Sequence, residues 1–144
     1  MQLLGGLKPS RNGEPIDPTK TMTYKGLMLS GVPNFAITFG YTNASWTLKA
    51  DLVSEFVCRV LNYMDDNGFD TVQPEHPGAA VKEAPFMDFA PGYFKRSMHL
   101  LPKSGDKAPW RLKQNYLLDL RLIRTGKVNE ESLHFTKHRA PVTV

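Results

Sequence analysis

The chain has 144 residues, 41% hydrophobic and 22% charged, so it is long enough to form a domain with a core and too apolar for wholesale disorder. Its formal net charge is +4, but the lysines and arginines are scattered in runs of at most two, which argues against nucleic-acid binding. We expect no transmembrane segment, because no stretch reaches the roughly 18 apolar residues of a membrane span, and no signal peptide, because the start MQLLGGLKPS lacks that pattern.

A single cysteine, Cys58, is present, so no disulfide can form within the chain. This fits a reducing compartment, and we expect the cytoplasm. Cys58 falls among apolar residues of a helical pattern, which predicts a core position rather than a reactive nucleophile.

The first 22 residues are rich in turn formers. Asn12-Gly13 predicts a type I′ hairpin turn or a simple reversal between short, exposed flanks, and a short strand is expected near Leu3-Leu4. Residues 23–29 (TYKGLML) then read as a strand in which Gly26 marks either a bulge or a close approach of another group to the backbone.

Residues 34–39 read as a second strand, with Phe35, Ile37 and Phe39 on an apolar core face. A long helix is predicted to begin at Thr42 or Asn43, both good N-cap residues, and to end before Gly68 after about 20 to 24 residues. Its predicted buried stripe begins at Trp46 and continues through Ala50, Val53, Val57, Val60, Leu61 and Met64. The other faces are predicted to carry Lys49, Asp51, Glu55, Arg59 and Asn62.

The rest of the chain is proline-rich and irregular. Val72 is expected in a short strand, Phe86, Met87 and Phe89 are expected to anchor an extended loop, and residues 92–101 are expected to form a short helix. Pro109 favours the first turn of a second helix over Trp110–Arg124, and a last strand is expected over Ser132–Phe135. The fold class is therefore α/β, or α+β if the chain stands alone.

The junction between the second predicted strand and the long helix is the leading candidate site. Unpaired N–H groups at a helix N-terminus attract an anion or the polar edge of a ligand. Gly40, Ala44 and Ser45 are small and leave room for a ligand, and Tyr41 and Trp46 could supply either stacking on a ligand or packing within the protein.

Other familiar chemistry is missing from the sequence. His134 and His138 are four residues apart, but neither a long helix nor a third ligand accompanies them, so no metal site is predicted. The adjacent pairs Asp65-Asp66 and Glu130-Glu131 point their side chains in different directions and do not form a catalytic dyad. No GxSxG, Walker-type or GxGxxG motif occurs.

Two blocks of the sequence carry a family resemblance. KGLMLSGVPNFAITFGYTNASWTLKADLVSEFVCRVLNYM and PFMDFAPGYFKRSMHLLPKSGDKAPWRLKQNYLLDLRLIR are similar to the C-terminal region of FAD-containing, Baeyer–Villiger-type monooxygenases, particularly the group that activates thioamide prodrugs. The resemblance covers most of residues 1–135. It implies that residues 1–68 close a Rossmann-like FAD-binding domain and that residues 69–144 form an irregular cap.

The same resemblance implies the cofactors and their contacts. Gly40, Tyr41, Thr42, Asn43 and Trp46 are expected to contact FAD, with the helix N-terminus pointing at the pyrimidine side of the flavin. FAD and NADPH are the implied cofactors. The family's glycine-rich FAD and NADPH motifs, its fingerprint sequence and its active-site arginine have no counterpart here, so no catalytic residue is assigned.

Two functions follow as expectations. The first is the C-terminal part of an FAD- and NADPH-dependent monooxygenase, inactive without the missing motifs, which oxygenates a ketone, sulfur or nitrogen. The alternative is a non-catalytic module that packs on a protein partner or another copy through Phe86, Phe89, Tyr93 and Trp110.

Overall fold

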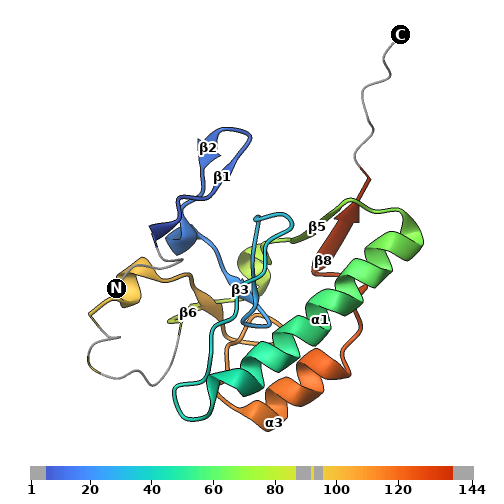
Figure 1. Cartoon of the computed structure of the whole chain (residues 1–144). Coiled ribbons are helices and arrows are strands. Elements are labelled where there is room, and N and C mark those ends of the chain that lie inside the picture. The colour runs from blue at the N-terminus through green and yellow to red at the C-terminus, as the bar shows by residue number, and fades with distance from the viewer. Residues whose placement is uncertain (1–5, 87–91, 93–95, 138–144) are drawn as a thin grey trace.

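A computed structural model describes residues 6–86, 92 and 96–137 of the chain (Figure 1). Among these residues, the helices α1 (Trp46–Asn67) and α3 (Tyr116–Asp119) lie side by side, and the strands, in four two-stranded antiparallel sheets, lie to one side of them. The strands are β1 (Ser10–Arg11), β2 (Glu14–Pro15), β3 (Thr23–Tyr24), β4 (Met28–Leu29), β5 (Thr71–Pro74), β6 (Glu83–Ala84), β7 (Ser104–Gly105) and β8 (Leu133–Thr136). The helix α3 continues into a π-helical turn at Leu120–Arg124.

The β1–β2 hairpin confirms the predicted turn. Asn12 and Gly13 have φ values of 52° and 85°, as a type I′ turn requires, and Arg11 pairs with Glu14 across it. Both strands are exposed, so this hairpin adds little to the core. The strand expected near Leu3-Leu4 lies outside the described residues.

The single strand predicted over residues 23–29 is wrong, because the chain reverses in its middle. Lys25 and Gly26 both have positive φ, 50° and 66°, and the Leu27 N–H donates to the Tyr24 carbonyl at 3.0 Å. β3 therefore pairs with β4 as a hairpin. Gly26 lies in a turn and not in a bulge, because its positive φ belongs to the reversal. The close approach predicted there is confirmed, since a side chain at Gly26 would overlap Leu112.

The strand predicted over residues 34–39 is also wrong. These residues pair with no strand among the described residues, although the alternation of the pattern is real: Phe35, Ile37 and Phe39 are half-buried, while Ala36 and Thr38 are exposed. The Ile37 N–H donates to the Leu27 carbonyl at 2.8 Å. The segment is thus an extended connection, and Phe39 packs against Phe86 with ring centroids 4.8 Å apart.

The long helix is confirmed, with corrections at its start and on its buried face. α1 has 22 residues and ends at the Gly68 C-cap, but its N-cap is Ser45 rather than Thr42 or Asn43. Of the predicted stripe, Val53, Val60 and Met64 are buried, whereas Trp46 and Leu61 are 57% and 52% exposed. The stripe is displaced toward the other buried residues of α1, namely Lys49, Leu52 and Phe56.

The second predicted helix begins later than expected. Asn115 caps it by accepting the Leu118 N–H at 3.1 Å, so α3 begins at Tyr116 and not at Trp110. Trp110 and Leu112 are buried in the core from a non-helical segment. Within the predicted helix at 92–101, the described residues contain a 3₁₀ turn at Met98–Leu100.

The last strand and the Val72 strand are confirmed, and they pair with each other. β5 and β8 form an antiparallel sheet in which Val72 lies opposite Phe135. The main core fills the space between α1, the β3–β4 hairpin and this sheet, and includes Tyr24, Phe56, Trp110 and Ile123. Mixed α/β structure is therefore confirmed. The closing of a Rossmann-like domain and the division at residues 68 and 69 stay predictions.

Cys58 is exposed on α1, so its predicted core position is wrong. Neighbouring Val57 is half-buried and Phe56 is buried, and Cys58 falls on the outward side of this turn. Within the described residues, no helix is both long and apolar enough to cross a membrane.

Candidate functional site: the loop before α1

The predicted cofactor loop begins at Gly40, which lies beneath the Trp46 ring. A Cβ atom at Gly40 would overlap the indole, so the small residue permits close packing of the ring on the backbone. The ring also lies 6.0 Å from Phe39, centroid to centroid. Gly40 and Trp46 are therefore brought together, and the outer part of the indole is left accessible.

Tyr41 points into the protein rather than toward solvent. Its side chain is 2% exposed, its hydroxyl donates to Asp119 Oδ2 at 2.8 Å, and its ring packs edge-on against Tyr116. Burial and the hydrogen bond to the Asp119 carboxylate raise the pKa of the Tyr41 phenol. The Tyr41 side chain thus fixes the loop to α3 from within.

Thr42 and Asn43 are exposed, and Gln114 holds both in place. The Thr42 N–H donates to Gln114 Oε1 at 2.8 Å, and Asn43 Nδ2 donates to the Gln114 carbonyl at 3.0 Å. The sequence predicted that Thr42 or Asn43 would cap α1, but neither does, because the N-cap is Ser45. Thr42 and Asn43 form a surface segment of fixed shape in front of the helix.

The N-terminus of α1 follows directly. The Ser45 hydroxyl accepts the Thr47 N–H at 3.4 Å, and residues 42–47 are exposed. No acidic side chain lies in the first turn of α1, so the partial positive charge of the helix N-terminus is not neutralised there. The arrangement suits an electron-rich ligand edge, although the predicted flavin contacts remain a prediction.

Lys49 was predicted on a helix face away from the buried stripe, and this is wrong, because Lys49 is buried below this loop with 1% exposure. Its Nζ lies 2.8 Å from Asp119 Oδ2 and 3.3 Å from the Lys25 carbonyl oxygen. Burial lowers the pKa of Lys49, and the charge of Asp119 opposes that shift. The sequence does contain an indication of this burial, because Lys49 is four residues before Val53 and therefore lies on the same helix face.

A second buried cluster has the same composition. Lys25 Nζ lies 3.0 Å from Glu130 Oε1, and the Tyr24 hydroxyl donates to Glu130 Oε2 at 2.8 Å. Burial lowers the pKa of Lys25, against the effect of Glu130. Each cluster therefore joins one lysine, one carboxylate and one tyrosine, and each connects the N-terminal half to the segment 119–130.

The histidines do not gather. His134 Nε2 lies 2.7 Å from Glu75 Oε2 at the surface, and His138 lies outside the described residues. In the part of the chain that the structure describes, no three His, Cys, Asp or Glu side chains are placed to hold a metal ion.

Two of the predicted partner anchors are buried inside the protein itself. Phe86 is 4% exposed and Trp110 is 2% exposed, so neither offers its ring to another chain in this structure. Phe89 and Tyr93 lie outside the described residues, as does Met87. Phe86 is confirmed as an anchor of its own loop, in the cluster with Leu101 and Leu112.

Comparison with known proteins gives strong matches. Over 143 residues the chain is 76% identical to "FAD-containing monooxygenase EthA" of Mycolicibacterium smegmatis, covering 99% of this chain and 29% of that protein. It is 65% identical over 144 residues to the protein of the same name from Mycobacterium tuberculosis, covering 100% and 29%. It is 43% identical over 138 residues to "Probable FAD-binding monooxygenase AlmA" of Acinetobacter baylyi, covering 95% and 28%.

The chain thus spans less than a third of the length of these curated relatives. No family model matches it, and no solved structure matches it. The identities nevertheless extend over nearly every residue, and they confirm the resemblance noted in the sequence. The chain is homologous, along almost its whole length, to a segment of the FAD-containing monooxygenases.

Proposed function

We propose that this chain is the C-terminal part of an FAD- and NADPH-dependent monooxygenase of the cytoplasm, which inserts oxygen beside a ketone or oxygenates a sulfur or nitrogen atom. The observation that carries the proposal is the 76% identity over 143 residues to a protein named as an FAD-containing monooxygenase. Because the chain corresponds to 29% of that protein, we expect it to be inactive alone.

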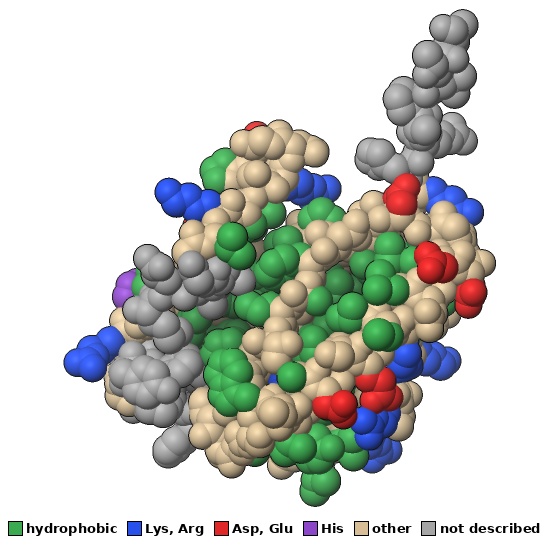
Figure 2. All heavy atoms as spheres, viewed as in Figure 1, with side chains coloured by type: hydrophobic (Ala, Val, Ile, Leu, Met, Phe, Trp, Pro, Cys, Tyr) green, Lys and Arg blue, Asp and Glu red, His purple; other side chains and the backbone are tan. Residues whose placement is uncertain are grey.

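An apolar area on one face of the molecule (Figure 2) supports the proposal that the chain packs against further protein. Figure 2 shows hydrophobic side chains gathered over the middle of one face, with charged side chains along its edge. In the part of the chain that the structure describes, the large apolar residues that remain exposed are Leu7, Trp46, Leu61, Leu100, Leu117 and Leu118. Extended apolar surface is uncommon on a lone domain and common where a domain packs on its neighbour.

In this proposal the loop before α1 lies along the flavin. The exposed segment Thr42–Asn43 and the indole of Trp46 would contact the ring, and the α1 N-terminus would stabilise negative charge on its pyrimidine side. Gly40 would allow the close approach, and Tyr41 would hold the loop from the inside. When bound, the flavin would supply the oxygen-activating chemistry.

A chimera tests the proposal. The matching segment of the M. smegmatis relative is replaced by this chain, and the purified product is assayed for flavin absorbance and substrate-dependent NADPH oxidation. We expect a yellow, active chimera and a colourless, inactive 144-residue chain. A well-folded chimera without flavin would contradict the proposal and favour the alternative of a non-catalytic module.

The loop contacts are tested in the same chimera. Asn43→Ala removes an exposed side chain whose recorded bond is to the Gln114 carbonyl, and Ser54→Ala is a matched change at an exposed position of α1. We expect Asn43→Ala to release flavin on dilution and Ser54→Ala to retain it. Equal retention by both variants would remove Asn43 from the flavin site.

A further inference from the structure

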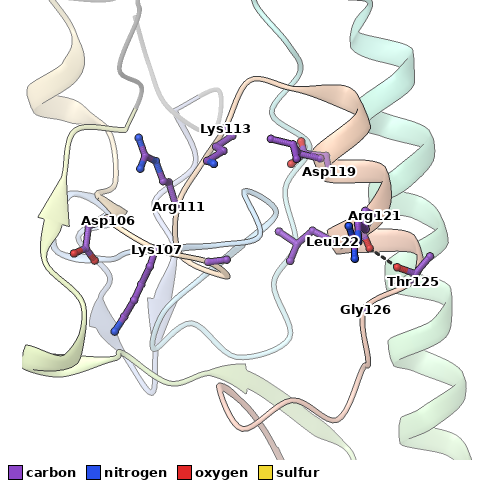
Figure 3. A pocket seen from close by; sticks show the side chains of 11 residues that line it. Asp106, Lys107, Arg111, Lys113, Asp119, Arg121, Leu122, Thr125 and Gly126 are labelled. Carbon is purple, nitrogen blue, oxygen red and sulfur yellow. Dashed lines mark hydrogen bonds between the residues drawn. The ribbon is translucent and has the colours of Figure 1, made fainter.

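A cavity of about 460 Å³ opens between the segment 106–113 and the wall formed by α3 and its π-helical turn. Figure 3 shows Lys107, Arg111 and Lys113 on the first side, and Asp119, Leu122 and Gly126 on the second. This volume lies within the roughly 300–1,000 Å³ of small-molecule sites. The cavity is separate from the surface segment Thr42–Asn43 proposed to meet the flavin.

The cavity combines an apolar interior with a cationic margin. Ala108, Leu118 and Leu122 supply apolar surface. The basic residues that line it are Lys107, Arg111, Lys113 and Arg121. Lys107, Lys113 and Arg121 are exposed, and these three are called the basic residues of the margin. Like charges that line one opening raise the local concentration of anions there.

The acidic residues of the lining do not cancel this charge. Asp119 is already paired with Lys49 at 2.8 Å, so that carboxylate is neutralised by a buried partner. Asp106 also lines the cavity, and its Oδ1 accepts the backbone N–H of Lys82 at 3.1 Å, so its single negative charge offsets only one of the lining cations. The cavity therefore keeps an excess of positive charge.

The carbonyl end of the π-helical turn would ordinarily repel an anion from this wall. Here, these carbonyls accept hydrogen bonds from two cationic side chains, those of Arg59 and Lys25. Arg59 donates to the carbonyls of Ile123, Arg124 and Gly126 at 2.6–2.9 Å, and Lys25 Nζ lies 3.4 Å from the Leu122 carbonyl oxygen. The negative charge at this end of the helix is thereby partly neutralised.

We propose that this cavity binds a small organic anion, with an apolar body seated on Ala108, Leu118 and Leu122 and a carboxylate or phosphate group held by the basic residues of the margin. An apolar lining with a few convergent charges is the usual design of a site for such a ligand. Charge-assisted hydrogen bonds from arginine and lysine are among the stronger contacts to carboxylate and phosphate.

Fluorescence titration of the 144-residue chain tests the proposal. The probe is 8-anilinonaphthalene-1-sulfonate, an apolar anion, and N-phenyl-1-naphthylamine is its neutral counterpart. We expect one saturable site for the anion and binding of the neutral probe weaker by about tenfold, as expected when one charged contact is missing. Octanoate and octyl phosphate should displace the anionic probe, whereas octanol and inorganic phosphate alone should not.

Charge-reversal variants locate the site. Lys113→Glu and Arg121→Glu each change an exposed side chain, so folding should be preserved and can be checked by circular dichroism. Each should weaken binding of the anionic probe by about tenfold and leave binding of the neutral probe unchanged. Leu118→Gln should weaken binding of both probes. Lys8→Glu, which reverses an exposed charge outside the cavity, should weaken binding of neither.

Three results would overturn the inference: equal affinity for the two probes, non-saturable binding of the anion, or the same loss of affinity in Lys8→Glu as in Lys113→Glu. None of these measurements involves flavin or NADPH. The outcome is therefore independent of the proposed monooxygenase function.

Discussion

Lys49 is the residue that joins the candidate loop to the rest of the core. Its ammonium group meets Asp119 at 2.8 Å with 1% and 6% of the two side chains exposed, and Asp119 also accepts the Tyr41 hydroxyl. A buried pair of this kind does not guarantee a large net stabilisation, but loss of one partner leaves an uncompensated charge. The carboxylate therefore depends on Lys49 and Tyr41 together.

Lys49→Met should lower the free energy of unfolding by about 3 kcal/mol, since it leaves the Asp119 carboxylate buried without its counter-ion. Urea denaturation at neutral pH measures the loss. In Lys49→Met/Asp119→Asn the buried charge is gone and the amide oxygen can still accept from Tyr41, so this double variant should be the more stable of the two. A double variant less stable than Lys49→Met would contradict the account.

The Tyr24 phenol should make stability fall in alkaline solution. Burial and the charge of Glu130 raise its pKa above the ordinary value of 10.0. As pH rises above that value, the phenol ionises in the unfolded chain while the folded chain keeps its proton, so the free energy of unfolding decreases by about 1.4 kcal/mol per pH unit from this group. Compared with the unchanged chain, in which the lysines ionise in the same way, Tyr24→Phe should reduce the fall of the free energy of unfolding with pH by about 1.4 kcal/mol per pH unit in urea titrations between about pH 10.5 and 11.5. If the free energy of unfolding falls equally steeply with pH in Tyr24→Phe, the proposed role of the Tyr24 phenol is wrong.

At the scale of elements, Arg59 attaches the segment after α3 to α1. Its guanidinium lies between the helices and binds three carbonyls, those of Ile123, Arg124 and Gly126. The planar fork of arginine suits several carbonyls at once, which a lysine ammonium cannot reproduce in the same geometry. Arg124, by contrast, pairs with Asp51 and Glu55 while 41% of its side chain is exposed.

These two arginines form a matched pair for a stability experiment. Arg59→Met should lower the free energy of unfolding by about 2 kcal/mol, because the three carbonyls lose a charged donor. Arg124→Met should have a much smaller effect, because its ion pairs are exposed and weakened by solvent. Thermal unfolding of both variants gives the comparison, and equal losses would show that the carbonyl contacts do not attach the segment.

The sequence predicted these elements where the local signal was strong. The Asn12-Gly13 turn, the body of α1 and the β5 and β8 strands all follow from turn chemistry and periodicity. The start of α1 and the start of α3 were misplaced, because several residues can cap a helix and the structure uses Ser45 and Asn115. The segment 34–39 has the alternation of a strand, but alternation does not provide a pairing partner.

In the candidate site, too, some features could be predicted from the local sequence and others could not. Its position before the long helix could be read from the sequence, whereas the inward direction of Tyr41 could not. That direction depends on Asp119, 78 positions away. Likewise, the burial of Lys49 and Lys25 depends on carboxylates 70 and 105 positions further along, and no local pattern predicts such pairs.

On the scale of the whole molecule, the backbone amides of α1 should be better protected from hydrogen exchange than those of the β1–β2 hairpin. Leu52, Phe56 and Val60 of α1 are almost fully buried, while the β1–β2 hairpin is exposed. Native-state hydrogen exchange should therefore be slower for amides in the middle of α1 than for amides of residues 10–15. Mass-spectrometric exchange of the 144-residue chain measures both, and slow exchange in the hairpin would refute this distribution.

The Glu130 contacts have a consequence for the order of folding during synthesis. Glu130 is the acceptor for both Lys25 and Tyr24, which precede it by 105 and 106 positions, and β8, the partner of β5, comes later still. Until Glu130 has emerged from the ribosome, the β3–β4 turn would have to bury an ammonium group without its counter-ion. Closure of the core is thus postponed until the β8 segment has been synthesised, and contacts of such long range make it slow.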